Sequence, residues 1–423
     1  MEPSKSNICV KKMKIAYILN VFPCLYHTFI LNDILNLMKN GHEVLVLSIG
    51  RSHEKVMNKG VFNLKNNIYY FDDFLIKNNL VGTRYFIEFA KKYRKYNPFY
   101  RFFGKCLFGN SVSGIDAERY SKNFGWGIYA LKRIADKLKE ENVDIIHGAF
   151  GANESTAAMI LSELTEIPFS FETHAKDLFV YFEYASEKIE KAKKIFTISE
   201  YNKKYLINDL KCPASKIILK RVPFNRSHCD QIPEKQRKED LILAVCRLNP
   251  IKGLEYAIEA FSLVAQKRDE LRFKIVGDGP LKEELFRKVK KLQLTEKITF
   301  LGNMSNEDAM DLVAQSTIVV LPSVIIKNGD RDGIPTSLIE AMYLKTPVIS
   351  SRISGIPELI DDGINGFLTE PGDVRQIAEK MEELLLDKVL RSRMGEGARE
   401  KIINNFDNNE NSNKLIDAWR EIV

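Results

Sequence analysis

The chain has 423 residues, of which 63 are basic and 56 acidic, giving a net charge of +7. This length exceeds one typical hydrophobic core and favours two α/β domains of about 200 residues each. A mild charge excess spread over a highly charged chain does not by itself indicate nucleic-acid binding. The six cysteines show no CxxC pair and no metal-ligand spacing, and neither a secretory signal nor a membrane-spanning apolar run is evident. We therefore expect a cytoplasmic protein.

Short β-rich runs alternate with helical stretches in both halves of the chain. In the first half the runs begin at Lys14, Glu43, Val143, Phe169 and Lys194. After a polar stretch the pattern resumes, with runs that begin at Leu241, Phe273, Lys297, Ser316, Thr346 and Gly366. This alternation predicts parallel sheets covered by helices on both faces. The expected fold is α/β, with two doubly wound Rossmann-like domains facing a cleft and ligands at the carboxyl ends of the strands.

The same pattern gives four expected segments. Residues 1–226 form an N-terminal domain, and the polar residues 227–240, which have little to bury, form a linker. Residues 241–400 form a C-terminal domain. The helical residues 401–423 are expected to pack back on the first domain, with Trp419 as the anchor.

The stretch GDRDGIPTSLIEAM, residues 329–342, predicts a loop that becomes a helix after a buried strand. Pro335 sits near the first turn, where its missing N–H costs least. The free N–H groups of residues such as Thr336, Ser337 and Leu338, together with the helix dipole, make a site for a phosphate-like anion.

Two acids flank this anion site. A carboxylate beside a phosphate would repel it, so Asp332 and Glu340 are expected to face neutral hydroxyl groups. Glu340 would accept hydrogen bonds from a ribose diol and Asp332 from the hydroxyls of a transferred sugar. Taken alone, Asp332 also fits a turn residue and Glu340 a surface residue of a helix.

Three further stretches follow predicted strands of the second half. CRLNPIKG supplies the cations Arg247 and Lys252, which can neutralise a diphosphate. VGDGPL contains Gly277 and Gly279, which would let backbone approach a nucleotide base closely. SGIPE places Glu358 where it fits either a ligand contact or a helix cap.

The order and spacing of these motifs resemble the retaining GT-B glycosyltransferases of the large fourth family, and within it the exopolysaccharide transferases of the colanic-acid type. The resemblance covers nearly the whole chain and is strongest over residues 241–373. The family usually has glutamate where this chain has Asp332. By resemblance, Arg247 and Lys252 bind the donor diphosphate, Glu340 the ribose and Asp332 the donor sugar. The donor-binding set that this implies is Gly277, Gly279, Gly333, Ile334, Pro335, Thr336, Ser337 and Glu340.

Strand ends of the first half are also similar to the family. FPCLYHTFILNDI contains His27 and Thr28, and IIHGAFG contains His147; these three are placed on the acceptor side. FETHAKDLF contains His174, whose neutral imidazole would hydrogen-bond a donor-sugar hydroxyl. His147 fits a structural role equally well. Ser199 is expected to cap a helix.

The predicted activity is transfer of a sugar, with retention, from a nucleotide-diphosphate sugar to a glycan or lipid-linked acceptor in the synthesis of cell-surface polysaccharides or glycoconjugates. Its catalytic residues would be His174, Arg247, Lys252 and Asp332. No metal or other cofactor is expected, because no metal-binding Asp-x-Asp is identified at a plausible strand end and the two cations would stabilise the departing diphosphate. A glycosidase-like carboxylate pair is a rival interpretation of Asp332 and Glu340. The alternative functions are a sugar-nucleotide epimerase of the same fold and a non-catalytic carbohydrate-binding protein.

Residues 83–105 carry seven basic residues, one acid and nine aromatics. This composition suits peripheral contact with an anionic bilayer, which would place the protein on the inner face of the membrane. It equally suits a helical pair whose aromatics pack inward. No recognisable nucleic-acid module accompanies it, so no nucleic-acid partner is expected.

Overall fold

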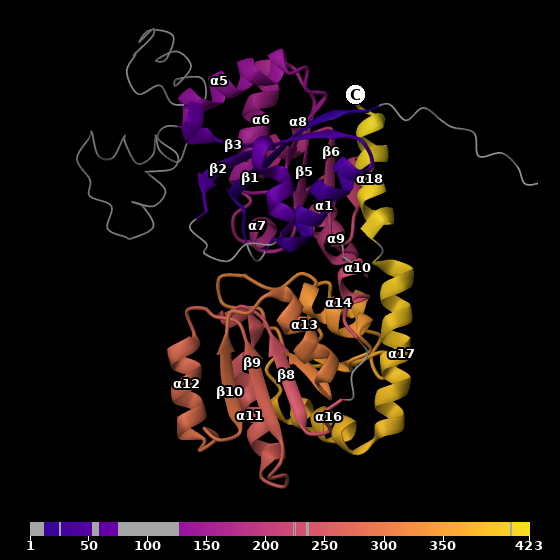
Figure 1. Cartoon of the computed structure of the whole chain (residues 1–423). Helices are drawn as coiled ribbons and strands as arrows, with labels where there is room; N and C mark the ends of the chain where they lie inside the picture. The colour runs from indigo at the N-terminus through magenta and orange to yellow at the C-terminus, as the bar shows by residue number, and fades with distance from the viewer. Residues whose placement is uncertain are drawn as a thin grey trace, which may run out of the picture. The chain divides into compact units, whose positions relative to one another are not determined.

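The computed structural model describes residues 12–24, 27–52, 59–74, 127–222, 224, 226–233, 237–406 and 408–423 (Figure 1). The basic, aromatic segment 83–105 lies outside the described residues, so the prediction of membrane contact stays a prediction. Within the described ranges, no helix combines the length and the apolar character needed to cross a membrane.

A seven-stranded sheet is built from the first half of the chain, in the order β3-β2-β1-β4-β5-β6-β7. β1 pairs in parallel with β2 and β4, β2 with β3, and β4 with β5. The strands are β1 (Lys14–Phe22), β2 (Glu43–Arg51), β3 (Ile68–Tyr70), β4 (Ile145–Gly148), β5 (Phe169–Thr173), β6 (Lys194–Thr197) and β7 (Ile217–Leu219). All five strand runs expected in this half are confirmed, and β3 and β7 are additional.

Helices and turns connect these strands. α6 packs against β1 and β4 through an apolar face that includes Ala158 and Met159, both fully buried. Ser199 caps α9, since its Oγ accepts from the backbone N–H of Asn202 at 3.1 Å, as predicted. The elements are α1 (Thr28–Lys39), η1 (Lys59–Asn67), η2 (Phe71–Phe74), α5 (Gly127–Glu140), α6 (Asn153–Thr165), α7 (Lys176–Phe179), α8 (Ala185–Lys191), α9 (Glu200–Asn208), η4 (Ala214–Lys216) and α10 (Arg226–Cys229).

A six-stranded sheet is built from the second half, in the order β10-β9-β8-β11-β12-β13, and all its neighbouring strands are parallel. The strand order reverses between β8 and β11, which is the position where doubly wound sheets bind ligands. The strands are β8 (Leu241–Val245), β9 (Arg272–Val276), β10 (Ile298–Gly302), β11 (Ile318–Leu321), β12 (Val348–Ser351) and β13 (Phe367–Thr369). Each corresponds to an expected run.

The core of this second sheet is apolar and tightly covered. Ile242 and Ile275 are fully buried, and Phe261 of α11 packs on Phe273 with ring centroids 5.4 Å apart. The covering elements are η5 (Pro250–Lys252), α11 (Leu254–Ala265), α12 (Lys282–Lys291), α13 (Asn306–Gln315), α14 (Thr336–Tyr343), α15 (Ile356–Leu359), α16 (Val374–Leu386) and α17 (Lys388–Asn405), and α18 (Asn408–Arg420) follows. The doubly wound α/β architecture and the helical closing segment are therefore as predicted.

The chain divides into two compact units. The first comprises residues 1–172, 183–195 and 416–423, and the second comprises residues 173–182 and 196–415. The domain boundaries predicted from the sequence remain predictions.

The polar segment expected to have little to bury is fastened to the second unit. It contains α10, whose Cys229 is buried, so this part of the expectation is wrong. Arg237 donates hydrogen bonds to the Leu344 carbonyl at 2.8 Å and to Thr346 Oγ1 at 2.7 Å. These contacts fix the chain just before β8.

Trp419 belongs to the first unit and is fully buried. Its indole N–H donates to Ser170 Oγ at 2.8 Å, and its ring lies edge-on to His147 with centroids 5.2 Å apart. Trp419 thus contacts residues of β4 and β5, and the packing of the whole segment 401–423 on the first domain stays a prediction.

Candidate functional site

Two strand-end loops of the second sheet are held together at Gly253. This glycine has φ +61°, and a Cβ on it would lie 2.0 Å from the Pro322 carbonyl oxygen. The Val324 N–H donates to the Ile251 carbonyl at 2.9 Å. The loop after β8 is therefore clamped to the loop after β11, and only glycine fits at the contact.

This clamp brings Lys252 and Asp332 together. Lys252 Nζ lies 2.6 Å from Asp332 Oδ1, and Ser323 Oγ donates to Asp332 Oδ2 at 2.5 Å. Only 15% of the lysine side chain and 10% of the aspartate side chain are exposed. Burial pulls the pKa of Lys252 down, but the Asp332 carboxylate and neighbouring Cys246 push it up by more, so the net pKa is raised. The ammonium group is therefore charged at neutral pH.

The sequence predicted separate roles for Lys252 and Asp332, whereas the structure pairs their side chains. From the sequence, Lys252 was assigned to a diphosphate and Asp332 to sugar hydroxyls, and a contact between the two side chains was not considered. In the structure they form one buried ion pair at the switch point of the sheet. An ammonium group has three donors and a carboxylate about four acceptor sites, so both keep capacity for a ligand.

The helix after this loop starts as predicted. Pro335 is the N-cap residue of α14, and the Leu338 N–H bonds back to the Pro335 carbonyl at 3.1 Å. Within the described part of the chain, the N–H groups of Thr336 and Ser337 make no hydrogen bond. The first turn of α14 thus presents two unsatisfied donors beside the ion pair.

Glu340 lies in the second half of α14. Its Oε1 accepts from Asn306 Nδ2 at 3.1 Å. Burial raises the pKa of Glu340 to about 7, and the hydrogen bond from Asn306 offsets only part of the rise. Glu340 is half-buried, so it is not a fully exposed surface residue of the helix.

Gly277 and Gly279 are required by contacts within the protein itself. A Cβ on Gly277, whose φ is +125°, would lie 1.9 Å from the Cys246 carbonyl oxygen. A Cβ on Gly279 would lie 2.5 Å from the Leu248 carbonyl oxygen. These contacts explain both glycines without a ligand, and their role in donor binding stays a prediction. Arg247 lies in the same loop and is exposed.

The residues just before α14 pack closely against side chains of neighbouring segments. A Cβ on Gly333 would lie 2.6 Å from Ile198 Cδ1 and 3.6 Å from Ala175 Cβ. Ile334 is buried, and its Cγ1 lies 2.8 Å from the Cβ position of Gly355. The Ile334 side chain is thus a packing residue, so any donor contact there would involve backbone atoms.

His174 is held next to this loop, since it precedes Ala175. Its backbone N–H donates to Asp177 Oδ1 at 3.0 Å, and its carbonyl accepts from the Asn202 side chain. The structure therefore brings the predicted His174 and Asp332 loops together within the second unit.

Glu358 is a helix cap, which decides between the two roles that the sequence left open. Its carboxylate accepts from the backbone N–H groups of Glu200 at 3.0 Å and Tyr201 at 2.9 Å, at the start of α9. Arg221 Nη1 donates to the same carboxylate at 3.0 Å. Glu358 therefore anchors α9 and is not assigned a ligand.

The three acceptor-side residues belong to the first unit. His147 is fully buried, with its Nδ1 2.9 Å from Ser170 Oγ and its ring 4.8 Å from that of Tyr17. This environment favours the structural role. His27 precedes α1 and packs its ring 5.2 Å from Phe150, and Thr28 is the first residue of α1.

The sequence interpretation passed over Asp330 and Arg331. Together with Asp332 they form an Asp-x-Asp sequence, a signal that was present in the quoted stretch. Asp330 is buried and lies 3.7 Å from Lys176 Nζ; burial raises its pKa, and Lys176 opposes the rise. Among the described residues, no cluster of three or more His, Cys, Asp or Glu side chains fits a metal ion. The expectation of a metal-free reaction remains a prediction.

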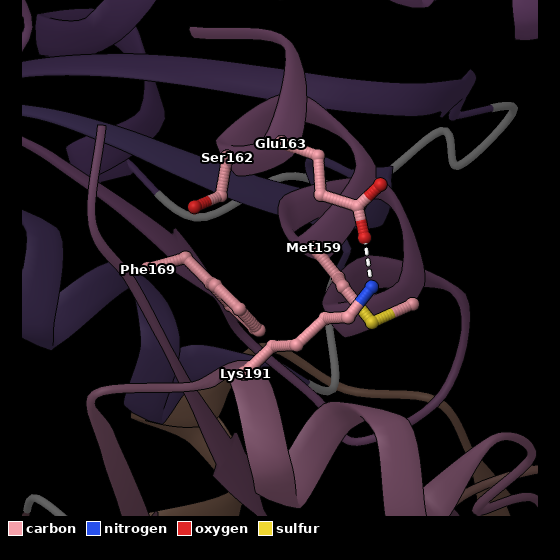
Figure 2. A pocket seen from close by; sticks show the side chains of 5 residues that line it. All are labelled: Met159, Ser162, Glu163, Phe169 and Lys191. Atoms are coloured by element: carbon pink, nitrogen blue, oxygen red, sulfur yellow. Dashed lines mark hydrogen bonds and ion pairs between the residues drawn. The ribbon is translucent and has the colours of Figure 1, made fainter. Parts of the chain in front are cut away.

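A hollow of about 500 Å³ lies elsewhere, on the first unit (Figure 2). Figure 2 shows an ion pair between Lys191 and Glu163 at its side. The hollow is lined by Met159, Ser162, Glu163, Phe169 and Lys191, and none of these residues was placed in a site from the sequence.

Comparison with known proteins agrees with this arrangement. Residues 226–401 match the family model described as Glycosyl transferases group 1. The fold is GT-B. A crystal structure of Anabaena Alr3699/HepE in complex with UDP and glucose aligns over 97% of this chain and 100% of that chain, with a TM-score of 0.69 and 15% identity.

Two curated relatives carry names that refer to colanic acid or amylovoran biosynthesis. The amylovoran biosynthesis glycosyltransferase AmsK of Erwinia amylovora is 35% identical over 40% of this chain and 41% of its own length. A protein of Escherichia coli (strain K12) assigned to colanic acid biosynthesis as the glycosyltransferase WcaL is 32% identical over 46% of this chain and 48% of its own length. The chain spans less than half the length of either relative.

Proposed function

We propose that this protein is a retaining glycosyltransferase that moves a sugar from a nucleotide-diphosphate sugar to a glycan or lipid-linked acceptor during polysaccharide synthesis. The observation that carries the proposal is the buried Lys252–Asp332 pair at the switch point of the second sheet. The group 1 family match covers this region, and relatives named for colanic acid and amylovoran synthesis support the pathway class.

The donor diphosphate would bind where positive groups converge. The remaining N–H donors of Lys252 and the unsatisfied N–H groups of Thr336 and Ser337 supply these groups. A helix start and an ammonium group stabilise an anion more strongly in a water-poor loop than in bulk water. The exposed Arg247 would close over the diphosphate from the neighbouring loop.

The acids would then bind neutral alcohols. Asp332 has acceptor capacity beyond Lys252 and Ser323, and it would take hydroxyls of the donor sugar. Glu340 would accept the ribose diol. His174, held by Asp177, would hydrogen-bond a further sugar hydroxyl.

In the chemical step the bond between the anomeric carbon and the diphosphate oxygen breaks, and its electron pair goes to the diphosphate. The acceptor hydroxyl attacks from the same face and gives its proton to the departing phosphate oxygen. The protein contributes by stabilising the charge that develops on the diphosphate, which is commonly worth about 10²- to 10³-fold in rate for each well-placed donor.

The proposal is tested by screening nucleotide sugars for thermal stabilisation and for release of the nucleoside diphosphate, with and without EDTA. We expect at least one nucleotide sugar to stabilise the protein. Lys252→Ala should lower kcat/KM by about 10²-fold or more. Lys267→Ala is the matched control, because Lys267 is 76% exposed and its ion pair with Glu382 contributes little.

Two results would overturn the proposal. One is that no nucleotide sugar binds, and the other is that Lys252→Ala reacts as well as the parent. A sugar-nucleotide epimerase would convert the donor to a second sugar nucleotide without any acceptor, so product analysis separates it from a transferase. Loss of activity with EDTA would refute the metal-free mechanism alone.

A further inference from the structure

The second unit carries a surface of aromatic rings and cations that the proposed donor site does not use. We call it the aromatic platform and define it as Lys176, Phe179, Tyr181, Tyr201 and Arg331. Tyr181 is 45% exposed and Tyr201 36% exposed, and 56% of the Lys176 side chain is open to solvent.

The rings and cations of the platform contact one another in two groups, and α7 links the groups because it carries both Lys176 and Phe179. The Arg331 guanidinium lies 4.3 Å from the Phe179 ring centroid, and its Nη1 donates to the Tyr201 hydroxyl at 2.8 Å. The rings of Phe179 and Tyr201 are 5.9 Å apart, and Lys176 Nζ lies 5.2 Å from the Tyr181 ring centroid. Exposed tyrosines that pack against cations provide both a flat apolar face and polar edges.

The platform is fixed in position by its neighbours. The Tyr201 backbone N–H is held by Glu358, and Arg331 Nε donates to the Gly329 carbonyl at 2.9 Å. Side chains that are positioned in advance lose little conformational freedom when a ligand binds. This anchoring is more than an exposed helix needs for its own stability.

The charge of the platform is positive. Lys176 and Arg331 contribute two cations, and exposed Lys327 lies in the same loop. Two carboxylates lie against the platform: Asp330 is buried and 3.7 Å from Lys176, and Glu358 is already paired with Arg221. Guanidinium and ammonium groups bind carboxylate and phosphate oxygens, whereas ring faces pack on the C–H faces of sugars.

The platform adjoins the proposed donor site through the chain itself. Arg331 stands between Asp330, which faces Lys176, and Asp332, which pairs with Lys252. A sugar bound on the platform would therefore lie near Asp332, the residue that we place at the donor sugar, because Asp332 directly follows Arg331 in the chain.

We propose that the aromatic platform binds the acceptor, and that this acceptor is a glycan with an anionic group, a carboxylate or a phosphate, on or beside the sugar that stacks on Tyr181 and Tyr201. This inference rests on the proposed function, because it assigns the second substrate of the same reaction. Lys176 and Arg331 bind the anionic group, and the ring faces bind the sugar.

The test uses calorimetry on the whole chain with three probes. These are a hyaluronan hexasaccharide, which carries carboxylates, the neutral chitohexaose of equal length, and glucose 1-phosphate. We expect the hyaluronan oligosaccharide or glucose 1-phosphate to bind about tenfold more tightly than chitohexaose. Tighter binding of the hyaluronan oligosaccharide identifies a carboxylate as the anionic group, and tighter binding of glucose 1-phosphate identifies a phosphate. Equal binding of charged and neutral probes, or no binding of either charged probe, overturns the inference.

Variants locate the binding on the platform. Lys176→Gln and Tyr181→Ala should each weaken binding of the anionic probe about tenfold. Both side chains are exposed, so their loss leaves the core intact. Lys193→Gln is the matched control, because Lys193 is an exposed lysine of the first unit. Unchanged binding of the anionic probe by Lys176→Gln overturns the inference.

Nucleotide-sugar binding by the same variants separates the two proposals. It should be unaffected in Lys176→Gln and Tyr181→Ala. Failure of the parent to bind any nucleotide sugar overturns the proposed function. Normal nucleotide-sugar binding, together with variants that bind the anionic probe as well as the parent does, overturns only the acceptor assignment. A Lys176→Gln variant that loses both ligands would indicate general damage to the loop and would also refute the assignment.

Discussion

Glu340→Gln should make the protein more stable above neutral pH while weakening nucleotide binding. Glu340 has a pKa of about 7 because it is buried, compared with 4.5 for the free side chain. The folded protein therefore keeps this proton over a pH range in which the unfolded chain has lost it. The stability that this proton contributes is complete below about pH 4.5 and is lost as the pH rises toward 7.

The size of the effect follows from the two pKa values. Each pKa unit corresponds to about 1.4 kcal/mol, so ionising Glu340 in the folded state costs about 3 kcal/mol. Glutamine has nearly the same shape, keeps an acceptor for Asn306 and never ionises. The variant should therefore resemble the parent near pH 4.5 and exceed it by up to about 3 kcal/mol at pH 8.

The assay is urea unfolding at a series of pH values from about 4.5 to about 8.5. Glu379→Gln is the control, because Glu379 is an exposed residue of α16. In parallel, the parent's affinity for the nucleotide sugar identified in the screen should increase as the pH rises through about 7, since the ionised carboxylate is the better acceptor for a ribose diol. Glu340→Gln should bind that nucleotide sugar weakly at every pH. Equal pH dependence of stability in parent and variant would refute the reasoning about burial.

Three further changes test the loops and the closing helix. Gly253→Ala should lower the free energy of unfolding by several kcal/mol in urea, because the new Cβ would collide with the Pro322 carbonyl oxygen. The control is Gly302→Ala, with φ +71° and no atom within 4 Å, which should cost only about 1 to 2 kcal/mol. Similar losses in the two variants would show that the contact at Gly253 is not tight. Trp419→Phe should cost roughly 1 to 3 kcal/mol through the lost indole hydrogen bond and the void, and a neutral result would show that this contact is dispensable. Lys252→Ala should lower the free energy of unfolding by about 3 to 5 kcal/mol, because it leaves a buried carboxylate unpaired. Adding Asp332→Asn to this variant should recover part of that loss. Additive losses in this double-mutant cycle would contradict the ion pair.

The strands were predictable because their burial on both faces leaves near-continuous apolar runs. The run after Leu241 and the run after Ser316 became β8 and β11, which frame the proposed site. β3 and β7 were not predicted, since each has three residues and part of each is exposed to solvent. Such short edge strands carry too little pattern to separate them from loops.

The candidate site residues were named from the sequence and remain predictions, but the pairing of their side chains was not foreseen. The sequence located Lys252 and Asp332 at strand ends, yet they are 80 positions apart, and nothing local shows that they form an ion pair. Glu358 illustrates the same difficulty, because its capping partners at the start of α9 are 157 and 158 residues away. Gly277 was expected to make room for a ligand, and its nearest neighbour is instead a backbone carbonyl of the adjacent loop.

The position of Trp419 has a consequence for synthesis of the protein on the ribosome. Its hydrogen-bond partner Ser170 precedes it by 249 residues. At about 5 to 20 residues per second, the ribosome needs on the order of 10 to 50 s to add that length of chain. During that time the first sheet lacks the indole that contacts Ser170 and His147, so the nascent first unit exposes an incomplete core until Trp419 has been added.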